Sequence, residues 1–255
     1  RARRLGMEKD VKAAFSLEAA IVVPGGGDGA DVASRVASAA ADYLVAMRPY
    51  SHVLGVSWGK TLHQVAQALP AGWCPPLRVV QVNGGVSHSA APGLAAETAT
   101  MIAAKAHGEV TLLPTPAILE RRETKEAIES DRSIRGVLDH AATADTHLFS
   151  AGPASEVSIH VQSGYLKNTD IQSLQQSGAV GDVLGRYITP EGTIADRGLD
   201  KRTLGISLDT LREAPRRIAV VAGPEKHPVA LAIARSGLAT VMIMDEGTAT
   251  FLLGN

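Results

Sequence analysis

Short apolar runs rich in β-branched residues alternate with longer alanine-rich stretches along the whole chain. Most of these runs are almost continuously apolar and are bounded by glycine or proline, which is typical of parallel strands covered on both faces. We predict strands at Ala20–Val23, His52–Val56, Leu77–Val82, Val110–Leu113, Thr146–Ser150, Arg217–Ala222 and Thr240–Met244. The repeated strand–helix–strand order predicts an α/β fold, a doubly wound, mostly parallel sheet with helices on both faces.

The alanine-rich stretches between the runs carry apolar residues at helical spacing. In the first of them the apolar side chains fall near one face, and Asp28 or Asp31 is available as the N-terminal cap. We predict helices at Asp31–Met47, Lys60–Leu69, Gly93–His107, Lys125–Ala142, Leu208–Glu213 and Glu225–Arg235. The segment Ser155–Arg202 is less periodic and rich in glycine, so we expect a loop-rich insertion or cover there, with one short strand near Val183–Ile188.

Composition and charge narrow the classes of function. Hydrophobic residues make up 45% of the chain, enough for a large buried core, and the formal net charge of −1 does not favour nucleic-acid binding by the chain as a whole. The basic cluster at Arg1, Arg3 and Arg4 is short and is predicted to be a linker or tail. The single cysteine, Cys74, excludes an internal disulfide and fits a reducing cytoplasm.

Two further features bear on where the protein works. No apolar run reaches the roughly 18 residues that a membrane-spanning helix needs, and the start of the chain shows no signal-peptide pattern. The chain begins at Arg1 rather than at Met, so we expect it to be a piece of a longer protein. We therefore predict a cytoplasmic protein that does not engage a membrane.

The strongest local signal is Gly-Val-Ser-Trp-Gly-Lys-Thr-Leu over Gly55–Leu62, where a predicted strand turns into a helix. Doubly wound folds bind ligands beyond the carboxyl ends of their strands. Glycines allow a tight turn there, and the free amides at the start of a helix form a site for an anion. Ser57, Lys60 and Thr61 add hydroxyls and a positive charge, which favours phosphate binding. The alternative is that the glycines only permit the turn and that Thr61 only caps the helix.

Gly-Lys-Thr within this turn also raises the possibility of a nucleotide-binding P-loop, with Val241–Glu246 as its partner strand. That motif needs a glycine, four residues, and then Gly-Lys-Ser/Thr. The required first position is occupied by Leu54, and Gly55 is one residue too close to Gly59. The phosphate cradle would be one residue short, so nucleotide binding stays a minor alternative.

Two charged residues stand at other turns. Lys226 lies in the first turn of a predicted helix, where a cation opposes the helix dipole, and it either faces a bound anion or is a solvated side chain. Asp182 lies between glycines, and its carboxylate can accept hydrogen bonds from sugar hydroxyls or serve as an Asx-type turn residue.

Polar and small residues also follow two of the predicted strands. Gln81, Asn83 and Gly84 follow a buried strand, and the amides can orient a polyol or simply satisfy a turn. The turn Phe149–Pro153 follows another strand, and we expect Gly152 there to form part of a pocket wall.

Several chemistries find no support. The eight histidines and Cys74 show no metal-ligand spacing. No Gly-x-Ser-x-Gly elbow is present for a serine nucleophile, and the Gly25–Gly29 run lacks the spacing of a dinucleotide-binding fingerprint. We therefore predict no metal, no cofactor and no catalytic acid–base pair.

Taken in their order along the chain, seven segments resemble the effector-binding domain of the SorC family of transcription regulators. They are Ala20–Pro24, Gly55–Leu62, Val80–Gly85, Leu113–Ala117, Gly178–Gly185, Val221–Lys226 and Met244–Ala249. Each segment alone is a weak signal, but their joint order is specific and spans nearly the whole chain.

This resemblance implies a Rossmann-like domain, related to sugar-phosphate isomerases, that forms homodimers or homotetramers and binds a phosphorylated sugar. Family members carry an N-terminal helix-turn-helix domain that binds operator DNA. We expect residues 1–18 to be the linker and first helix and residues 19–255 to be the effector-binding domain, with the helix-turn-helix domain absent from this chain.

The resemblance also implies roles for individual positions. Ser57, Gly59, Lys60 and Thr61 fall in its anion-binding loop, whereas the sugar side takes Gln81, Asn83 and Asp182, and Lys226 falls at a ligand-contacting lysine. Many relatives have smaller residues where Trp58 and Lys60 stand, so the identity of the ligand does not transfer. The expected ligand-binding residues are Ser57, Trp58, Gly59, Lys60, Thr61, Gln81, Asn83, Gly84, Gly152, Asp182 and Lys226.

These expectations describe a bacterial regulator of carbohydrate metabolism whose bound sugar phosphate modulates DNA binding by the missing domain. The alternative from another class is a sugar-phosphate isomerase on the same scaffold, which would need a carboxylate base within reach of the substrate.

Overall fold

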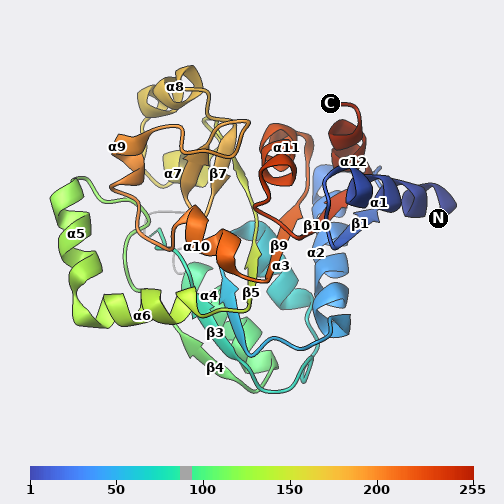
Figure 1. Cartoon of the computed structure of the whole chain (residues 1–255), viewed down its shortest axis with the longest axis horizontal. Coiled ribbons are helices and arrows are strands. Elements are labelled where there is room, and N and C mark those ends of the chain that lie inside the picture. Colours follow the sequence, from blue (N-terminus) through green and yellow to red (C-terminus); the bar gives the residue numbers. More distant parts are fainter. Residues whose placement is uncertain (87–93) are drawn as a thin grey trace.

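Seven parallel strands form the central sheet of the computed structural model, which describes residues 1–86 and 94–255 (Figure 1). The strands are β1 (Ala19–Val23), β2 (Val53–Val56), β3 (Arg78–Gln81), β4 (Glu109–Thr111), β5 (Thr146–Phe149), β9 (Arg216–Val221) and β10 (Val241–Asp245). Their order across the sheet is β1-β10-β9-β5-β2-β3-β4, and every neighbouring pair is parallel. All seven predicted strands are present, with bounds shifted by no more than two residues.

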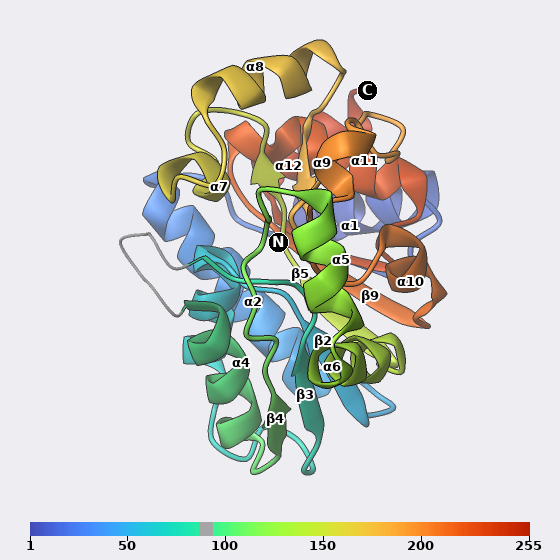
Figure 2. The same cartoon turned by 90° about the vertical axis from the view of Figure 1, so that its left-hand side faces the viewer.

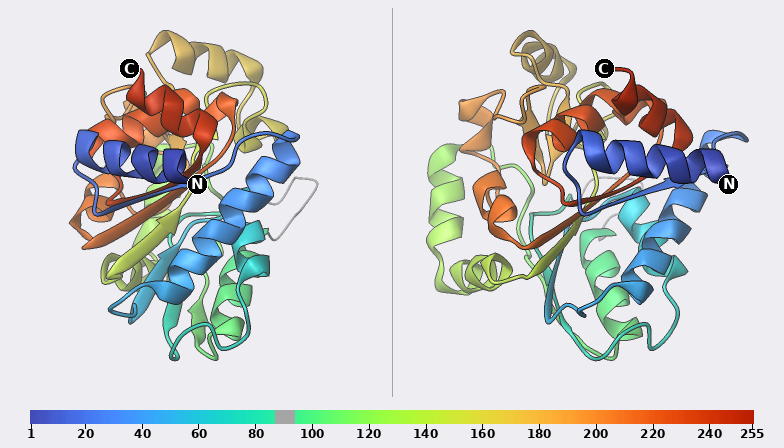
Figure 3. Two further views of the ribbon diagram at one scale, coloured as in Figure 1. Left: turned by 90° about the vertical axis from the view of Figure 1, so that its right-hand side faces the viewer. Right: turned by 45° about the vertical axis from the view of Figure 1, so that its right-hand side comes forward.

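Helices cover both faces of this sheet, which confirms the doubly wound fold (Figures 1 and 3). One face packs against α2 (Gly29–Ala46), α3 (Lys60–Ala68) and α4 (Leu94–Lys105). The other packs against α1 (Ala2–Ala14), α6 (Arg132–Ala142), α10 (Leu208–Glu213), α11 (His227–Ser236) and α12 (Glu246–Leu253). Burial on both faces explains why strands such as β10 are apolar at successive positions.

Several predicted helices have different limits in the structure. Lys125–Ala142 is two helices, α5 (Arg122–Ser130) and α6, because Asp131 between them is extended and caps α6 through the Ser133 amide. The predicted helix 225–235 is a 3₁₀ turn, η1 (Pro224–Lys226), followed by α11. Gly93, the predicted start of α4, lies outside the described residues.

The ends of the chain are more helical than the sequence pattern indicated. The basic residues that we expected in a linker or tail lie at or next to the start of α1, and α12 follows the last strand without having been predicted. Of the two aspartates considered as caps for α2, Asp28 is the cap, because its side chain accepts from the amide of Asp31. No helix in the described ranges is long and apolar enough to cross a membrane.

The segment expected to be a loop-rich insertion folds into a small unit, which we call the cap (residues 152–200) and which Figure 2 shows at one end of the molecule. It contains β6 (Gly152–Pro153), β7 (Gly181–Val183), β8 (Arg186–Ile188), α7 (Ile159–Gln162), α8 (Asn168–Gln176) and α9 (Arg197–Asp200). The single strand predicted near 183–188 is a hairpin. Leu184 and Gly185 at its tip both have positive φ, 56° and 77°, as a two-residue type I′ turn requires.

The strand order reverses between β2 and β5. From β2 the chain moves outward through β3 to β4, then returns to β5 on the other side of β2 and moves outward through β9 to β10. Ligands of open α/β sheets bind at the carboxyl ends of the strands where such a reversal occurs. Because β6 follows β5 directly and pairs with β7, the cap stands over this position.

Candidate functional site

The turn between β2 and α3 leaves the start of that helix open. The N-cap of α3 is Gly59, with φ 141°, and no side chain of residues 1–86 or 94–255 caps the helix. A Cβ added at Gly59 would meet no atom of the described residues within 4 Å, so that part of the structure leaves the space beside it open. By contrast, the helices that follow β1 and β10 are capped by Asp28 and Asp245. The uncapped amides of α3 are therefore available to an anion.

The two hydroxyls of this turn have different surroundings. Ser57 is buried, and its Oγ donates to Oδ1 of Asn83 at 2.8 Å, which joins the ends of β2 and β3. Thr61 is also buried, and its hydroxyl makes no hydrogen bond with any described residue. Ser57 thus orients Asn83 and can still accept a hydrogen bond, while Thr61 keeps its donor for a ligand.

Gln81 and Gly84 shape the loops beside the site. The buried Gln81 uses both amide hydrogens, donating to the carbonyl oxygens of Asn83 at 3.0 Å and Leu113 at 3.2 Å, and its Oε1 accepts from the Leu113 amide at 3.1 Å. A Cβ on Gly84 would lie 2.3 Å from the carbonyl oxygen of Pro116. This geometry favours the turn-satisfying role considered for Gln81 and Gly84 over ligand contact.

Trp58 connects the sheet to the cap. Its Nε1 donates to the carbonyl oxygen of Gly84 at 2.9 Å, and its ring belongs to an apolar cluster with Ile171, Leu174 and Tyr187 of the cap. Its large side chain therefore packs between the carboxyl end of β2 and the cap.

Asp182 reaches toward the sheet from β7. Its Oδ2 accepts from the amide of Gly185 at 3.1 Å, as in the turn role considered for it, whereas Oδ1 makes no hydrogen bond within the described residues. Gly152 pairs with Asp182 across β6 and β7, and a Cβ at Gly152 would lie 2.3 Å from that Oδ1. A side chain at position 152 would displace this carboxylate, because Oδ1 occupies the space that its Cβ would fill.

Lys226 lies on the η1 turn after β9, half-buried and without a hydrogen bond or ion pair to any described residue. Burial lowers the pKa of its ammonium, and the charge of Lys60 lowers it further, while the carboxylates of Glu225 and Asp182 oppose the shift. Lys226 is close enough to Lys60 at the start of α3 and to Asp182 in the cap for their charges to act on it. The β2–α3 turn, the cap and the β9–α11 turn therefore lie close together.

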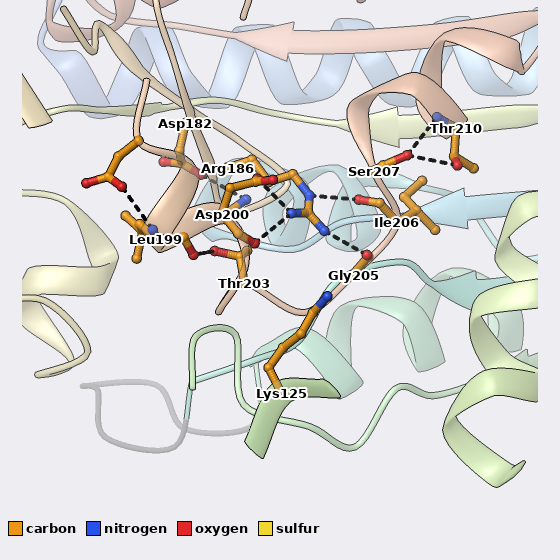
Figure 4. A network of polar contacts seen from close by, with 12 residues as sticks. Lys125, Asp182, Arg186, Leu199, Asp200, Thr203, Gly205, Ile206, Ser207 and Thr210 are labelled. Carbon is orange, nitrogen blue, oxygen red and sulfur yellow. Dashed lines mark hydrogen bonds and ion pairs between the residues drawn. The ribbon is translucent and has the colours of Figure 1, made fainter. Parts of the chain in front are cut away.

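Arg186, at the end of the glycine-rich segment around Asp182, has a structural role that sequence reasoning did not assign (Figure 4). Its buried guanidinium donates to the carbonyl oxygens of Ile206 at 3.0 Å and Gly205 at 2.9 Å, and to Oδ1 of Asp200 at 2.8 Å. Gly205 in turn bridges to Asn83. Arg186 thereby holds the chain after the cap against the loop that carries Asn83.

A row of hydrogen-bonded, buried polar side chains lies beside Asp182 within the cap. The Tyr187 hydroxyl lies 2.7 Å from Oγ of Ser158 and 2.9 Å from Nδ1 of His160, and Tyr187 pairs with Asp182 across the hairpin. Burial, and then the Asp182 charge, raise the pKa of Tyr187, and burial lowers the pKa of His160 although Asp182 opposes that shift. His160 and Tyr187 are therefore neutral, and no local sequence signal marks them.

The geometry does not fit a P-loop. Gly55 lies inside β2, where a Cβ would be 2.2 Å from Nδ1 of His147, so it cannot open a loop. Only residues 57–59 separate β2 from α3. Among the residues that the structure describes, no three His, Cys, Asp or Glu side chains are placed to hold a metal ion.

Comparisons with known proteins agree with this fold. Residues 2–254 match the family model described as "Putative sugar-binding domain". The chain is 31% identical over 246 residues to YjhU, a transcriptional regulator of Escherichia coli, covering 94% of this chain and 74% of that protein. It is 29% identical over 239 residues to the deoxyribonucleoside regulator of Bacillus subtilis, covering 94% of this chain and 76% of that protein.

Among solved structures, a domain of a "possible sugar-binding transcriptional regulator" from Arthrobacter aurescens superposes with a TM-score of 0.89. The two sequences are 28% identical, and the match covers 98% of this chain and 97% of that one. The relatives are transcriptional regulators, which confirms the prediction that the chain is not an enzyme. The chain belongs to the family of sugar-binding domains carried by transcriptional regulators of the SorC type.

Proposed function

We propose that this chain is the effector-binding domain of a bacterial regulator of carbohydrate metabolism, and that its effector is a phosphorylated sugar bound where β2 and β5 end. The observation that carries the proposal is the unpaired, half-buried ammonium of Lys226 near the uncapped start of α3. Lys226 has no ion-pair partner among the described residues, and the nearby carboxylates of Glu225 and Asp182 offset its charge without bonding to it. The ammonium and the start of α3 together favour an anion between them.

In this arrangement the phosphate lies against the first amides of α3, where the Thr61 hydroxyl donates to it. Lys60 and Lys226 supply positive charge, and their mutual repulsion falls when a dianion lies between them. The free Oδ1 of Asp182 and the amide of Asn83 then read hydroxyls on the sugar. Burial of these groups makes each contact selective, because an analogue that lacks the matching hydroxyl leaves them unpaired.

The same contacts provide a route from binding to regulation. A ligand held by the β2–α3 turn, the β9–α11 turn and the cap joins three parts of the molecule that are far apart in sequence. It stabilises the arrangement in which they are close, and a DNA-binding domain that senses this arrangement changes its affinity for the operator. We propose that the cytoplasmic regulator is a homodimer or homotetramer with helix-turn-helix domains, and that subunit rearrangement transmits the signal.

Isothermal titration with a panel of pentose and hexose phosphates tests the ligand site. Lys226→Met and Thr61→Val are each expected to weaken binding of the best phosphorylated sugar by about tenfold or more, because each removes a donor to a charged group. Lys12→Ala is the matched control, since Lys12 is an exposed lysine on α1. Wild-type affinity in both site variants, or an equal loss in the control, would overturn the proposal.

A further inference from the structure

A hydroxyl without a hydrogen-bond partner lies at the carboxyl end of β5. Ser150 comes directly after the last residue of this strand, and its Oγ is buried and bonded to no described residue. A hydroxyl taken out of water without a partner costs free energy, so an orphan of this kind in a folded protein needs an explanation.

The orientation of β5 places Ser150 on the side of α3. Side chains alternate along a strand, so Ser150 shares a face with Leu148, which packs in the same core cluster as Leu62 and Val65 of α3. The last registered pair between β2 and β5 is Val56 with Leu148. Two residues beyond this pair, the segments that continue β2 and β5 reach Trp58 and Ser150, beside the open space at Gly59.

The chain that follows Ser150 leads directly to the charged groups of the site. Two residues later the chain reaches Gly152, which pairs with Asp182. The β6 strand also lies against η1, which carries Lys226. Ser150 therefore stands between the uncapped start of α3 and the unpaired ammonium, the two features to which the anion was assigned.

We propose that the Ser150 hydroxyl is a ligand-contacting group that donates to the anionic oxygen held between α3 and Lys226. This inference rests on the proposed function and adds a binding residue to it. The unmade hydrogen bond weakens the free protein and is completed only when the ligand is present. The same side chain thus lowers stability without ligand and raises affinity with it.

Ser150→Ala separates this role from a structural one, with Ser51→Ala as the matched control. Ser51 lies just before the amino end of β2, and its hydroxyl donates to Asp145 and to the carbonyl oxygen of Val53. Ribose 5-phosphate and inorganic phosphate are titrated into each purified protein, and the melting temperature of each is measured without ligand. The phosphorylated probe that wild type binds best then serves for the comparison.

For Ser150→Ala we expect a melting temperature equal to or above that of wild type, and an affinity about 10- to 100-fold weaker. For Ser51→Ala we expect a lower melting temperature and unchanged affinity. If Ser150→Ala binds within about twofold of wild type, or melts as low as Ser51→Ala, the assignment of Ser150 is wrong while the proposed function stands. If wild type binds neither probe, nor any other sugar phosphate, the proposed function fails and the assignment fails with it.

Discussion

His147 lies in the centre of the sheet on β5, and neither of its ring nitrogens has a hydrogen-bond partner among the described residues. Its ring occupies the space left by the missing side chain of Gly55 on the neighbouring strand. Burial lowers its pKa to about 4, with the nearby charge of Arg217 acting in the same direction and Asp145 opposing. The folded protein therefore holds His147 neutral.

This histidine makes stability depend on pH. The pKa falls from 6.5 in the unfolded chain to about 4 in the fold. As the pH falls below 6.5, the imidazole of His147 binds a proton in the unfolded state but stays neutral in the folded state. The free energy of unfolding therefore decreases. The contribution of His147 is fully present above pH 6.5 and is lost by about pH 4, with a total of about 3 kcal/mol.

Urea unfolding at a series of pH values between 7.5 and 4.5 measures this effect. His147→Leu has no group that titrates, so its free energy of unfolding is expected to fall less than that of wild type across this range. Parallel pH profiles for the two proteins would contradict the assignment to His147.

Among the elements, the β7–β8 hairpin depends on Arg186 for its place against the sheet. The guanidinium donates to three backbone carbonyls and a carboxylate, all within residues 200–206, where the chain leaves the cap. The side chain of Arg186 is only 7% exposed, so its partners have little water to replace it. Removal of the guanidinium would leave the buried carbonyl oxygens of Gly205 and Ile206 without this donor, and would leave Asp200, whose side chain is 29% exposed, without its ion-pair partner.

Arg186→Met keeps the apolar stem of the side chain and removes the fork of donors. We expect it to lower the free energy of unfolding by about 2–4 kcal/mol. Arg186→Lys is expected to recover only part of this loss, because an ammonium cannot reproduce the planar geometry. Chemical denaturation of the three proteins decides the matter, and an Arg186→Met variant as stable as wild type would show that the network adds nothing.

At the scale of the whole molecule, the sheet has two edges, and α1 closes the one formed by β1. Glu8 on α1 accepts a hydrogen bond from the amide of Val22 at 2.9 Å, which satisfies an edge-strand donor that has no neighbouring strand. At the end of the same strand, Glu246 of α12 accepts from the amide of Gly25 at 3.2 Å and lies 3.7 Å from Arg4 of α1. The two terminal helices, side by side in Figure 3, are thus part of the fold.

Glu8→Ala leaves the Val22 amide without its partner. We expect a loss of about 1–2 kcal/mol in the free energy of unfolding and faster hydrogen exchange at Val22. Asp10→Ala on the same helix is the matched control, because Asp10 is exposed and makes no such contact. Unchanged exchange at Val22 in Glu8→Ala, or an equal change in Asp10→Ala, would show that α1 does not protect this edge through Glu8.

Local pattern was sufficient for most of the fold. Continuous apolar runs predict strands that are buried on both faces. The seven strands and their parallel orientation could therefore be inferred before any contact was known. The pattern failed where long-range contacts decide the structure. Asp131 divides one predicted helix by capping the next. The small sheet over residues 152–188 was not predicted, because its three short strands are held by pairing with one another.

By itself, then, the sequence determined the fold class and the family, because spacing and turn residues act over a few neighbouring positions. It also singled out the β2–α3 turn as the proposed place for an anion. Only the tertiary structure decided which side chains are free. It joins Ser57 to Asn83, uses the amide of Gln81 within the loops, and leaves Lys226 and Ser150 without partners among the described residues. Which of these side chains are bonded and which are free depends on which strands lie side by side. Hydrogen bonds between residues far apart in the sequence produce no periodic pattern in that sequence.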